Sequence, residues 1–261
     1  MVKDLKDPEP NRIFRLHELV DTIITCKKHI DYLVLPELSI PRKALNLICK
    51  RLKNKGISLI SGIEYKFDND AGKKIAVNEL IYVLCIEVEG IMQQLQITQE
   101  KVIPAHHEGI ALEMMANYHL KHTSTNKYII KHHGFFMSGL ICNELLNIDY
   151  RSELRGRIDS LIIVEWNPDI DTFSAQVEAA SNDLHCFIIQ VNNRKYGDTR
   201  IRAPYRESFK RDLARVKGGE LDYFVVSTLS VDQLRHFHRN YLSPNDPFKP
   251  MPTGFDISHA R

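Results

Sequence analysis

Short apolar runs of strand length alternate with segments in which apolar side chains recur every three or four residues. The runs predict buried strands, and the three-to-four repeat predicts amphipathic helices. A Pro near its start and a Gly just past its end support the helix over 41–55. We expect helices over 13–30, 41–55, 144–156, 171–183 and 231–240, and strands over 31–36, 57–63, 77–89, 91–97, 128–130, 137–142, 160–164, 185–191 and 222–227.

The segments between these elements are polar or irregular. Residues 64–74 are turn-like, residues 108–126 are helical or irregular, and a loop rich in Asn, Gly and Arg follows residue 191. Helices alternate with strands, and hairpins occur among them. The pattern therefore predicts an α/β fold in which a mixed sheet packs against helices. We expect a flexible lead-in over 1–12, one domain over 13–241 and a Pro-rich tail over 242–261.

The amino-acid composition argues against several classes of protein. The 261 residues are 43% apolar and 26% charged, with a net charge of +2, which is too small to indicate nucleic-acid binding by itself. No apolar run reaches the roughly 18 residues needed to span a bilayer, and residues 1–12 lack the apolar core of a secretory signal. The five widely spaced cysteines predict reduced thiols. We therefore expect a cytoplasmic protein without membrane association.

Three polar residues each follow a predicted buried strand. Glu37 ends LVLPE, Lys101 comes just after strand 91–97, and Cys142 ends MSGLIC. Reactive groups in open α/β sheets collect outside the carboxyl ends of strands, so these three side chains are candidates for one site. Taken singly, a Cys at the end of an apolar strand is more often a core residue, and a Glu or Lys there is more often a surface charge.

The chemistry of the three residues fits together. A nearby ammonium group lowers the pKa of a thiol, and a carboxylate can take the thiol proton and later activate water. The Lys101 charge and the backbone N–H of Asn143 can stabilise the oxyanion of a tetrahedral intermediate. This set predicts a thiol nucleophile that attacks a carbonyl carbon.

Several blocks of sequence, in order, resemble the nitrilase superfamily of carbon–nitrogen hydrolases. LVLPELSIP at 33–41 is similar to the Glu block of the family, EKVIPAHHEG at 100–109 to its Lys block, and SGLICNELLNIDYR at 138–151 to its Cys block. The segments ISLISGIEY at 57–65 and RKYGDTRIRAP at 194–204 resemble a strand and a late loop of the family. The resemblance extends from residue 13 to about residue 241.

The resemblance implies a fold and a set of roles. The fold would be an α-β-β-α sandwich of two mixed sheets flanked by helices, assembled into a homodimer or higher oligomer. Glu37 would be the general base, Lys101 would stabilise the intermediate, Cys142 would be the nucleophile, and Glu108 would assist. The implied activity is hydrolysis of a non-peptide C–N bond of a small amide through a thioester, without a cofactor.

Residues around the implied site have alternative interpretations. Trp166 stands where the family often lines its pocket, although a packing role fits it equally well. His107 and His133 flank the implied pocket. Adjacent histidines on a strand point to opposite faces, and no Cys or carboxylate completes a ligand spacing, so we expect no metal site.

Residues 1–12 contain no counterpart of the family's opening strand. Either the chain is the carboxyl-terminal part of a longer protein, or another segment fills the gap, since a missing strand leaves edge groups unpaired. The chain also resembles nitrilase-like domains associated with bacterial anti-phage reverse transcriptases. The second hypothesis for function is therefore an assembly or ligand-binding module with weak or no catalysis, associated with such a reverse-transcriptase domain.

Two basic clusters allow more than one interpretation. The helix over 41–55 is rich in Lys and Arg, which indicates either a solvated face or a polyanion-binding face. The Arg residues of 194–206 either select an acidic substrate or pair with acids such as Asp198, and we favour pairing.

Overall fold

The computed structural model describes residues 11–219, 221–240 and 246–261, and the chain divides into two compact units. One unit extends up to Asn126, and the other runs from Lys127 to Arg261. Each unit has its own mixed sheet with flanking helices, which confirms the predicted α/β class with two mixed sheets. Most of the predicted lead-in lies outside the described residues, and its last two residues, Asn11 and Arg12, belong to the first helix.

The first unit is built on a five-stranded sheet. The spatial order is β1-β2-β3-β4, and β5 pairs with β3. β1 is parallel to β2, β3 is antiparallel to both β2 and β4, and the short β5 is parallel to β3. The five strands are β1 (Tyr32–Ile40), β2 (Ser58–Asp70), β3 (Lys73–Val88), β4 (Ile91–Glu100) and β5 (His119–Leu120).

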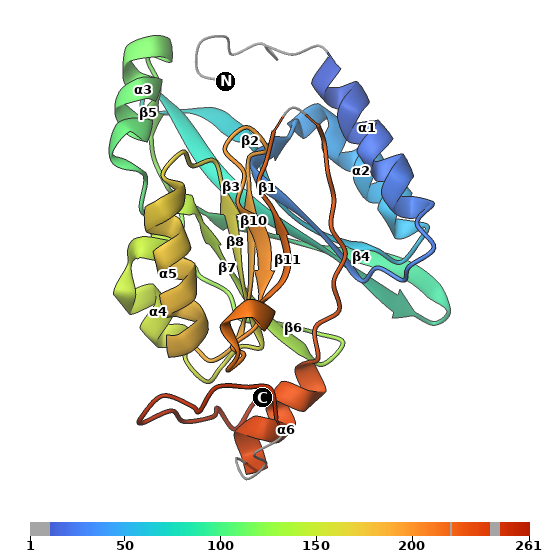
Figure 1. The fold of residues 1–261 in the computed structure, drawn as a ribbon. Helices are drawn as coiled ribbons and strands as arrows, with labels where there is room; N and C mark the ends of the chain where they lie inside the picture. Colours follow the sequence, from blue (N-terminus) through green and yellow to red (C-terminus); the bar gives the residue numbers. More distant parts are fainter. Residues whose placement is uncertain (1–10, 220, 241–245) are drawn as a thin grey trace. The chain divides into compact units, whose positions relative to one another are not determined.

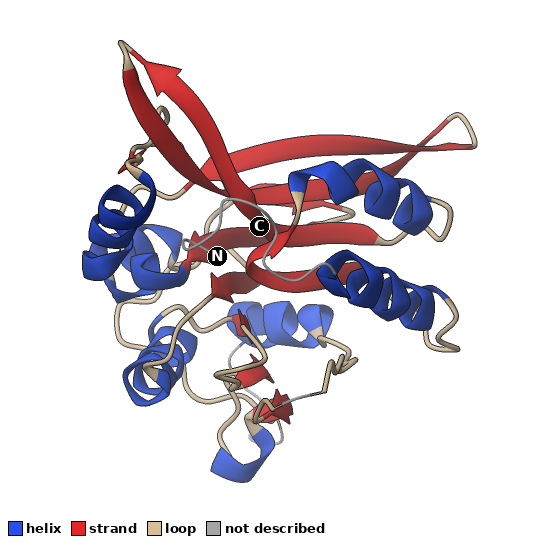
Figure 2. Ribbon diagram, turned by 90° about the horizontal axis from the view of Figure 1, so that it is seen from above, coloured by secondary structure: helices blue, strands red, loops and turns tan. Residues whose placement is uncertain are grey.

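Three helices belong to the first unit: α1 (Asn11–Ile24), α2 (Arg42–Lys53) and α3 (His106–Ala116). α1 ends six residues before the predicted boundary at residue 30. α1 and α2 pack against each other, and α2 also contacts β2 and β4. Figures 1 and 2 show the two helices lying side by side along the sheet. The basic residues of α2 are partly engaged, because Arg42 pairs with Glu79 and Arg51 with Asp21, while Lys43 and Lys50 stay exposed.

The prediction of a turn over 64–74 was wrong. β2 and β3 continue through this region as a hairpin whose turn lies at Ala71 and Gly72, both with positive φ. The distal part of β2 is exposed from Lys66 onward, so neither of its faces needs apolar residues there. A strand that is solvated on both faces has no apolar alternation, and this explains why the sequence reads as a loop.

The second unit is built on a six-stranded sheet in the order β11-β10-β9-β8-β7-β6. β7, β8 and β9 are parallel, and the other neighbours are antiparallel. α4 and α5 lie beside one another next to this sheet (Figure 1). The strands are β6 (Ile130–His132), β7 (Phe135–Ile141), β8 (Ser160–Glu165), β9 (Phe187–Asn192), β10 (Thr199–Arg202) and β11 (Asp212–Val216), and the helices are η1 (Cys142–Leu146), α4 (Ile148–Leu154), α5 (Ile170–Asp183), η2 (Ser208–Lys210) and α6 (Val231–Asn240).

Three predictions for this unit needed correction. The helix over 144–156 is divided into η1 and α4 at Asn147, whose side chain caps α4 by accepting from the N–H groups of Asp149 and Tyr150. The loop after residue 191 contains β10 and β11, which pair with each other. Residues 222–227, which were predicted as a strand, are irregular, because this segment pairs with no strand among the described residues. The Tyr223 side chain is exposed.

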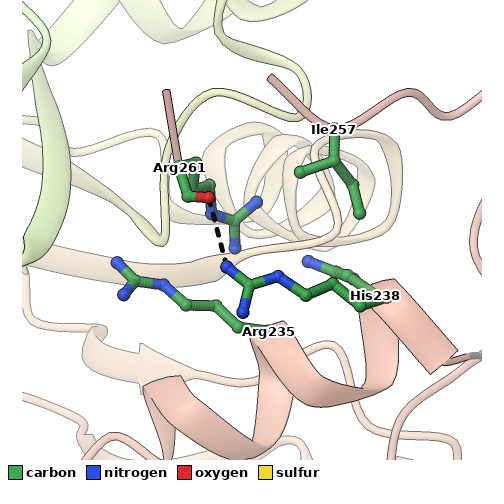
Figure 3. Close-up of a pocket in the computed structure, with 5 residues that line it drawn as sticks. Arg235, His238, Ile257 and Arg261 are labelled. Carbon is green, nitrogen blue, oxygen red and sulfur yellow. Dashed lines mark hydrogen bonds between the residues drawn. The ribbon is translucent and has the colours of Figure 1, made fainter. Parts of the chain in front are cut away.

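The described part of the Pro-rich tail, 246–261, is packed against the second unit. Phe248 is fully buried in an apolar cluster with Leu234 and Phe237 of α6. Asp159, which is also buried, accepts hydrogen bonds from Arg235 Nε at 2.9 Å and from Arg261 Nε at 2.7 Å. Figure 3 shows α6 and the end of the chain facing each other across a hollow lined by these arginines. The tail is thus fixed by a carboxylate held between two guanidinium groups.

Two buried histidines join α6 to the tail. His185 Nδ1 lies 2.8 Å from His238 Nε2, and His185 Nε2 lies 2.8 Å from the Lys249 carbonyl oxygen. Since that carbonyl can only accept, His185 Nε2 carries a proton and its Nδ1 accepts from His238. Burial lowers the pKa of His185 to about 4 and that of His238 to about 3, so both rings are neutral near pH 7.

Within the described residues, no helix is long and apolar enough to cross a membrane. All five cysteines are reduced thiols.

Candidate active site

Two carboxylates and one ammonium group form a buried cluster in the first unit. Lys101 Nζ donates to Glu37 Oε1 at 2.8 Å and to Glu108 Oε2 at 2.6 Å, and its side chain is only 2% exposed. Asn78 Nδ2 donates to both acids, at 2.7 Å and 2.8 Å, and the hydroxyl of Tyr65 donates to Glu108 at 2.9 Å. These contacts hold the three charged side chains in one fixed arrangement.

A large bulge in β1 places Glu37. The pairing of β1 with β2 jumps from Leu35–Ser61 to Ile40–Ile63, so the residues between Leu35 and Ile40 arch away from the ladder. Leu38 within the arch has a φ of 55°. Glu37 therefore lies inside the strand, not at its end as the sequence had predicted. A bulge of this kind re-aims a side chain that regular pairing would hold in the sheet.

The other two members come from the segment that follows β4. Lys101 is the first residue after β4, and its backbone N–H donates to the Asn78 carbonyl at 2.8 Å. Glu108 lies in the first turn of α3, where its Oε2 also accepts from the Ala105 N–H at 3.3 Å. A carboxylate is stabilised in the first turn of a helix because backbone N–H groups there lack partners within the helix.

The two carboxylates differ in proton affinity. Burial raises the pKa of Glu37, the charge of Lys101 lowers it and the charge of Glu108 raises it again, and the net direction is upward. Burial also raises the pKa of Glu108, but the charge of Lys101 and hydrogen bonds from Lys101, Asn78 and Tyr65 outweigh it, so the net direction is downward. Glu37 is therefore the member suited to proton transfer, while Glu108 stays ionised.

Cys142 occupies a sharp corner in the second unit. It follows β7 directly, begins η1 and has a φ of 49°, a conformation that costs a residue with a side chain about 1 kcal/mol or more. Glu144 holds the corner, since its Oε2 accepts from the Ile141 N–H at 3.0 Å and its Oε1 pairs with Lys127. The corner turns Cys142 and the backbone of Asn143 out of the strand direction, and such strained positions are frequent at reactive residues.

Solved structures with a similar fold include members of the CN-hydrolase, or nitrilase, superfamily. A CN-hydrolase superfamily protein from Xanthomonas campestris matches with a TM-score of 0.60 and 13% identity over 88% of each chain. An amidase of the nitrilase superfamily from Nesterenkonia AN1 matches with a TM-score of 0.58 and 14% identity over 89% of this chain and 91% of that one. A branch 10 member of the superfamily from Saccharomyces cerevisiae matches with a TM-score of 0.59 and 11% identity, over 81% and 83%.

The chain has the nitrilase fold. By sequence it matches no protein-family model and no curated protein. The likeness is therefore one of architecture, and the chemistry has to be argued from the residues.

The remaining predicted site residues lie at several places in this nitrilase fold. Asn143 follows Cys142 and is half-buried, and Trp166 follows β8 and is half-buried as well. His107 is exposed on α3, and His133 is exposed in the turn between β6 and β7. Among the residues that the structure describes, no group of three or more His, Cys, Asp or Glu side chains is arranged to hold a metal ion.

Sequence reasoning assigned no role to the two polar side chains that support the Lys101 cluster. Asn78 stands in a strand that reads as apolar, and Tyr65 stands in the segment predicted as turn-like. In the second sheet, Glu165 and Gln190 are buried polar residues. A polar residue inside an apolar strand is a usable signal, because burial without a partner is costly. Asn78 in VNEL, Glu165 in IVEW and Gln190 in IIQV all carry that signal.

Proposed function

We propose that this protein hydrolyses a non-peptide C–N bond of a small amide through a thioester on Cys142. The observation that carries the proposal is the buried cluster in which the Lys101 ammonium lies between the Glu37 and Glu108 carboxylates. The strained corner at Cys142 and the nitrilase fold support it. In a mutant of the amidase from Nesterenkonia sp. AN1, which has a similar fold, the acetamide moiety of fluoroacetamide is covalently added at the active-site cysteine.

In the first half-reaction, Cys142 Sγ attacks the amide carbonyl carbon and its proton passes to the Glu37 carboxylate. The Lys101 ammonium and the Asn143 N–H stabilise the negative oxygen. The tetrahedral intermediate collapses, the C–N bond breaks, and the amine leaves with the proton from Glu37. The product of this half is a thioester.

In the second half-reaction, Glu37 takes a proton from water and the resulting hydroxide attacks the thioester carbonyl. The C–S bond breaks, the carboxylic acid is released, and the proton returns to the sulfur. The raised pKa of Glu37 suits a group that must accept and return a proton in each half. The ionised Glu108 keeps Lys101 in place throughout.

A cysteine comparison tests the proposal. We expect Cys142→Ala to abolish the release of ammonia from a panel of primary amides, while Cys26→Ala, at a half-buried thiol, retains it. Mass spectrometry of wild-type protein quenched during turnover should show an acyl adduct on Cys142. Equal turnover by wild type and Cys142→Ala would exclude the mechanism.

Thiol labelling separates this function from the assembly module. An activated Cys142 should react with iodoacetamide near neutral pH much faster than the other four cysteines. Equally slow labelling of all five would favour the module. Oligomerisation and association with a reverse-transcriptase domain stay predictions from the resemblance, and light scattering of the purified chain tests the first.

A further inference from the structure

The outer strands of the two sheets differ in how their free edges are protected. Apart from the two-residue β5, the described part of the chain has four outer strands: β1, β4, β6 and β11. Proline, charged side chains, bulges and short length each hinder an edge from pairing with a further strand. β1 contains Pro36 and its arch, and β6 is three residues long with Lys131 at its centre. β11 contains Asp212 and Arg215 and a break in its register with β10.

β4 has none of these protective features. It pairs with β3 over ten consecutive residues without a break in register. From Ile91 to Gln99 it contains neither a charged residue nor a proline. No other strand among the described residues pairs with it. A long, regular and uncharged edge is a template for a further strand.

The turn between β3 and β4 determines which backbone groups point outward. Glu89 and Gly90 have φ values of 52° and 77°, so they form a two-residue turn of type I′. The flanking pair, Val88 and Ile91, is therefore hydrogen-bonded, and such pairs alternate along an antiparallel ladder. The residues whose N–H and C=O groups point away from β3 are therefore Met92, Gln94, Gln96 and Thr98.

The side chains of β4 restrict which strand can join this edge. On one face, Leu95 is 49% exposed and Ile91 is 61% exposed, next to Val88 of β3, which is 50% exposed. The other face contacts α2, where Gln94 Nε2 donates to the Cys49 carbonyl oxygen at 2.9 Å. A strand that fits the edge must be long, uncharged and apolar on one face. β4 itself has this pattern.

We propose that β4 pairs with β4 of a second copy of this chain, antiparallel about a two-fold axis at Leu95. Identical edges related by a two-fold axis run antiparallel. In this register Met92 pairs with Thr98 of the second copy and Gln94 with Gln96, which gives about eight hydrogen bonds between the copies. The two Leu95 side chains meet on the apolar face. Since Leu95 is the centre of the uncharged run, no charged residue faces another within it.

The length of the strand sets the expected strength. Nine residues at about 3.4 Å each make a contact about 30 Å long, and one strand pair buries less than an interface of standard size. We therefore expect dimerisation in the micromolar range. Sedimentation of the full chain from about 1 to about 100 μM measures it. Because the contact is uncharged, raising the salt concentration should leave the association unchanged.

Three variants assign the association to this edge. Leu95→Lys places two ammonium groups at the two-fold axis, and at the highest concentration it should have half the mass of the wild type. Gln96→Pro removes an outward N–H that β3 does not use, and it should weaken association about tenfold or more. Leu47→Lys, at an exposed leucine of α2, is the control and should associate like the wild type. Circular dichroism checks that each variant folds.

A cross-link tests the register. Opposite residues that are not hydrogen-bonded have Cα atoms about 4.5 Å apart, which a disulfide can span. Mild oxidation should link two copies of Leu95→Cys, but not two copies of Leu47→Cys or of the wild type with its five native cysteines. If another surface also joins copies, the wild type forms a larger species, and Leu95→Lys should still halve its mass. Equal masses of wild type and Leu95→Lys at every concentration, an equal loss in Leu47→Lys, or no cross-link in Leu95→Cys would each overturn the inference.

Discussion

Gly62 lies directly beneath the backbone of Glu37. A Cβ atom at Gly62 would come within 2.4 Å of Glu37 Cα and within 2.5 Å of the Leu38 nitrogen. Only a residue without a side chain permits the arch of β1 to sit on β2 at this point. The position of the acid in the Lys101 cluster thus depends on the absence of an atom from the neighbouring strand.

This relationship predicts the effect of Gly62→Ala. The methyl group has to displace the β1 backbone, so we expect a loss of stability of roughly 1–3 kcal/mol and a fall in kcat/KM of about 100-fold. Gly109→Ala is the control, because a Cβ there meets nothing within 4 Å. In that helix position alanine should keep activity and raise stability by up to about 1 kcal/mol. Urea unfolding and amide turnover measure both, and an active Gly62→Ala enzyme would contradict the role of the arch.

The buried ammonium predicts a large stability effect of Lys101→Met. Without Lys101, the carboxylates of Glu37 and Glu108 face each other without a cation, which we expect to cost about 3–5 kcal/mol at pH 7. The defect should shrink at low pH, where the acids can bind protons. Urea unfolding at pH 7 and pH 5 checks this, and Lys121→Met, at an exposed ion pair, should show no measurable change. An equal defect at both pH values would count against a charge effect.

The opposed pKa directions of the two acids predict a shift in the pH profile. In the proposed mechanism activity requires ionised Glu37, whose raised pKa should place the acid limb of kcat/KM above the usual glutamate range. The negative charge of Glu108 contributes to that rise, so Glu108→Gln should move the acid limb to lower pH while reducing the maximum rate. Glu113→Gln, at an exposed acid of the same helix, serves as the control and should leave the profile unchanged. An upward shift in Glu108→Gln would refute the assignment.

The buried histidines predict that stability falls with acid. Both His185 and His238 have folded-state pKa values far below the ordinary 6.5, so the unfolded chain binds more protons below about pH 6.5. Stability should therefore be fully present above pH 6.5 and decline as the pH falls toward 4, by up to about 1.4 kcal/mol per pH unit for each ring. His238→Gln should flatten the decline in urea unfolding followed from pH 7 to pH 4. Parallel curves for variant and wild type would exclude this source.

Elements with a one-sided or fully buried pattern could be predicted from the sequence. β1, β3 and β8 read as apolar runs because their side chains meet a core, and α2 reads as a helix because one stripe of it is buried. The distal β2–β3 hairpin could not be read, since it is solvated on both faces. The run over 222–227 has strand composition, yet a strand also needs a partner, and pairing is a long-range property that local sequence does not contain.

The candidate site could likewise be predicted from the sequence only in part. Glu37 and Lys101 could be predicted as neighbours because each follows an apolar strand, and the structure places them in contact. The arch at Glu37 could not be predicted, because its cause is Gly62 on the neighbouring strand. Nor could Asn78 be assigned, since its bridging role appears only when Glu37 and Glu108 are known to be neighbours.

The left-handed backbone at Cys142 lowers the stability of the fold at the same position that supplies the thiol for the proposed reaction. Glycine adopts that conformation without penalty, so Cys142→Gly should melt at a higher temperature than the wild type even though it carries no sulfur. A search of random variants for heat resistance alone would therefore favour loss of the proposed nucleophile, and a thermostable form of this protein has to be selected with a thiol assay running alongside.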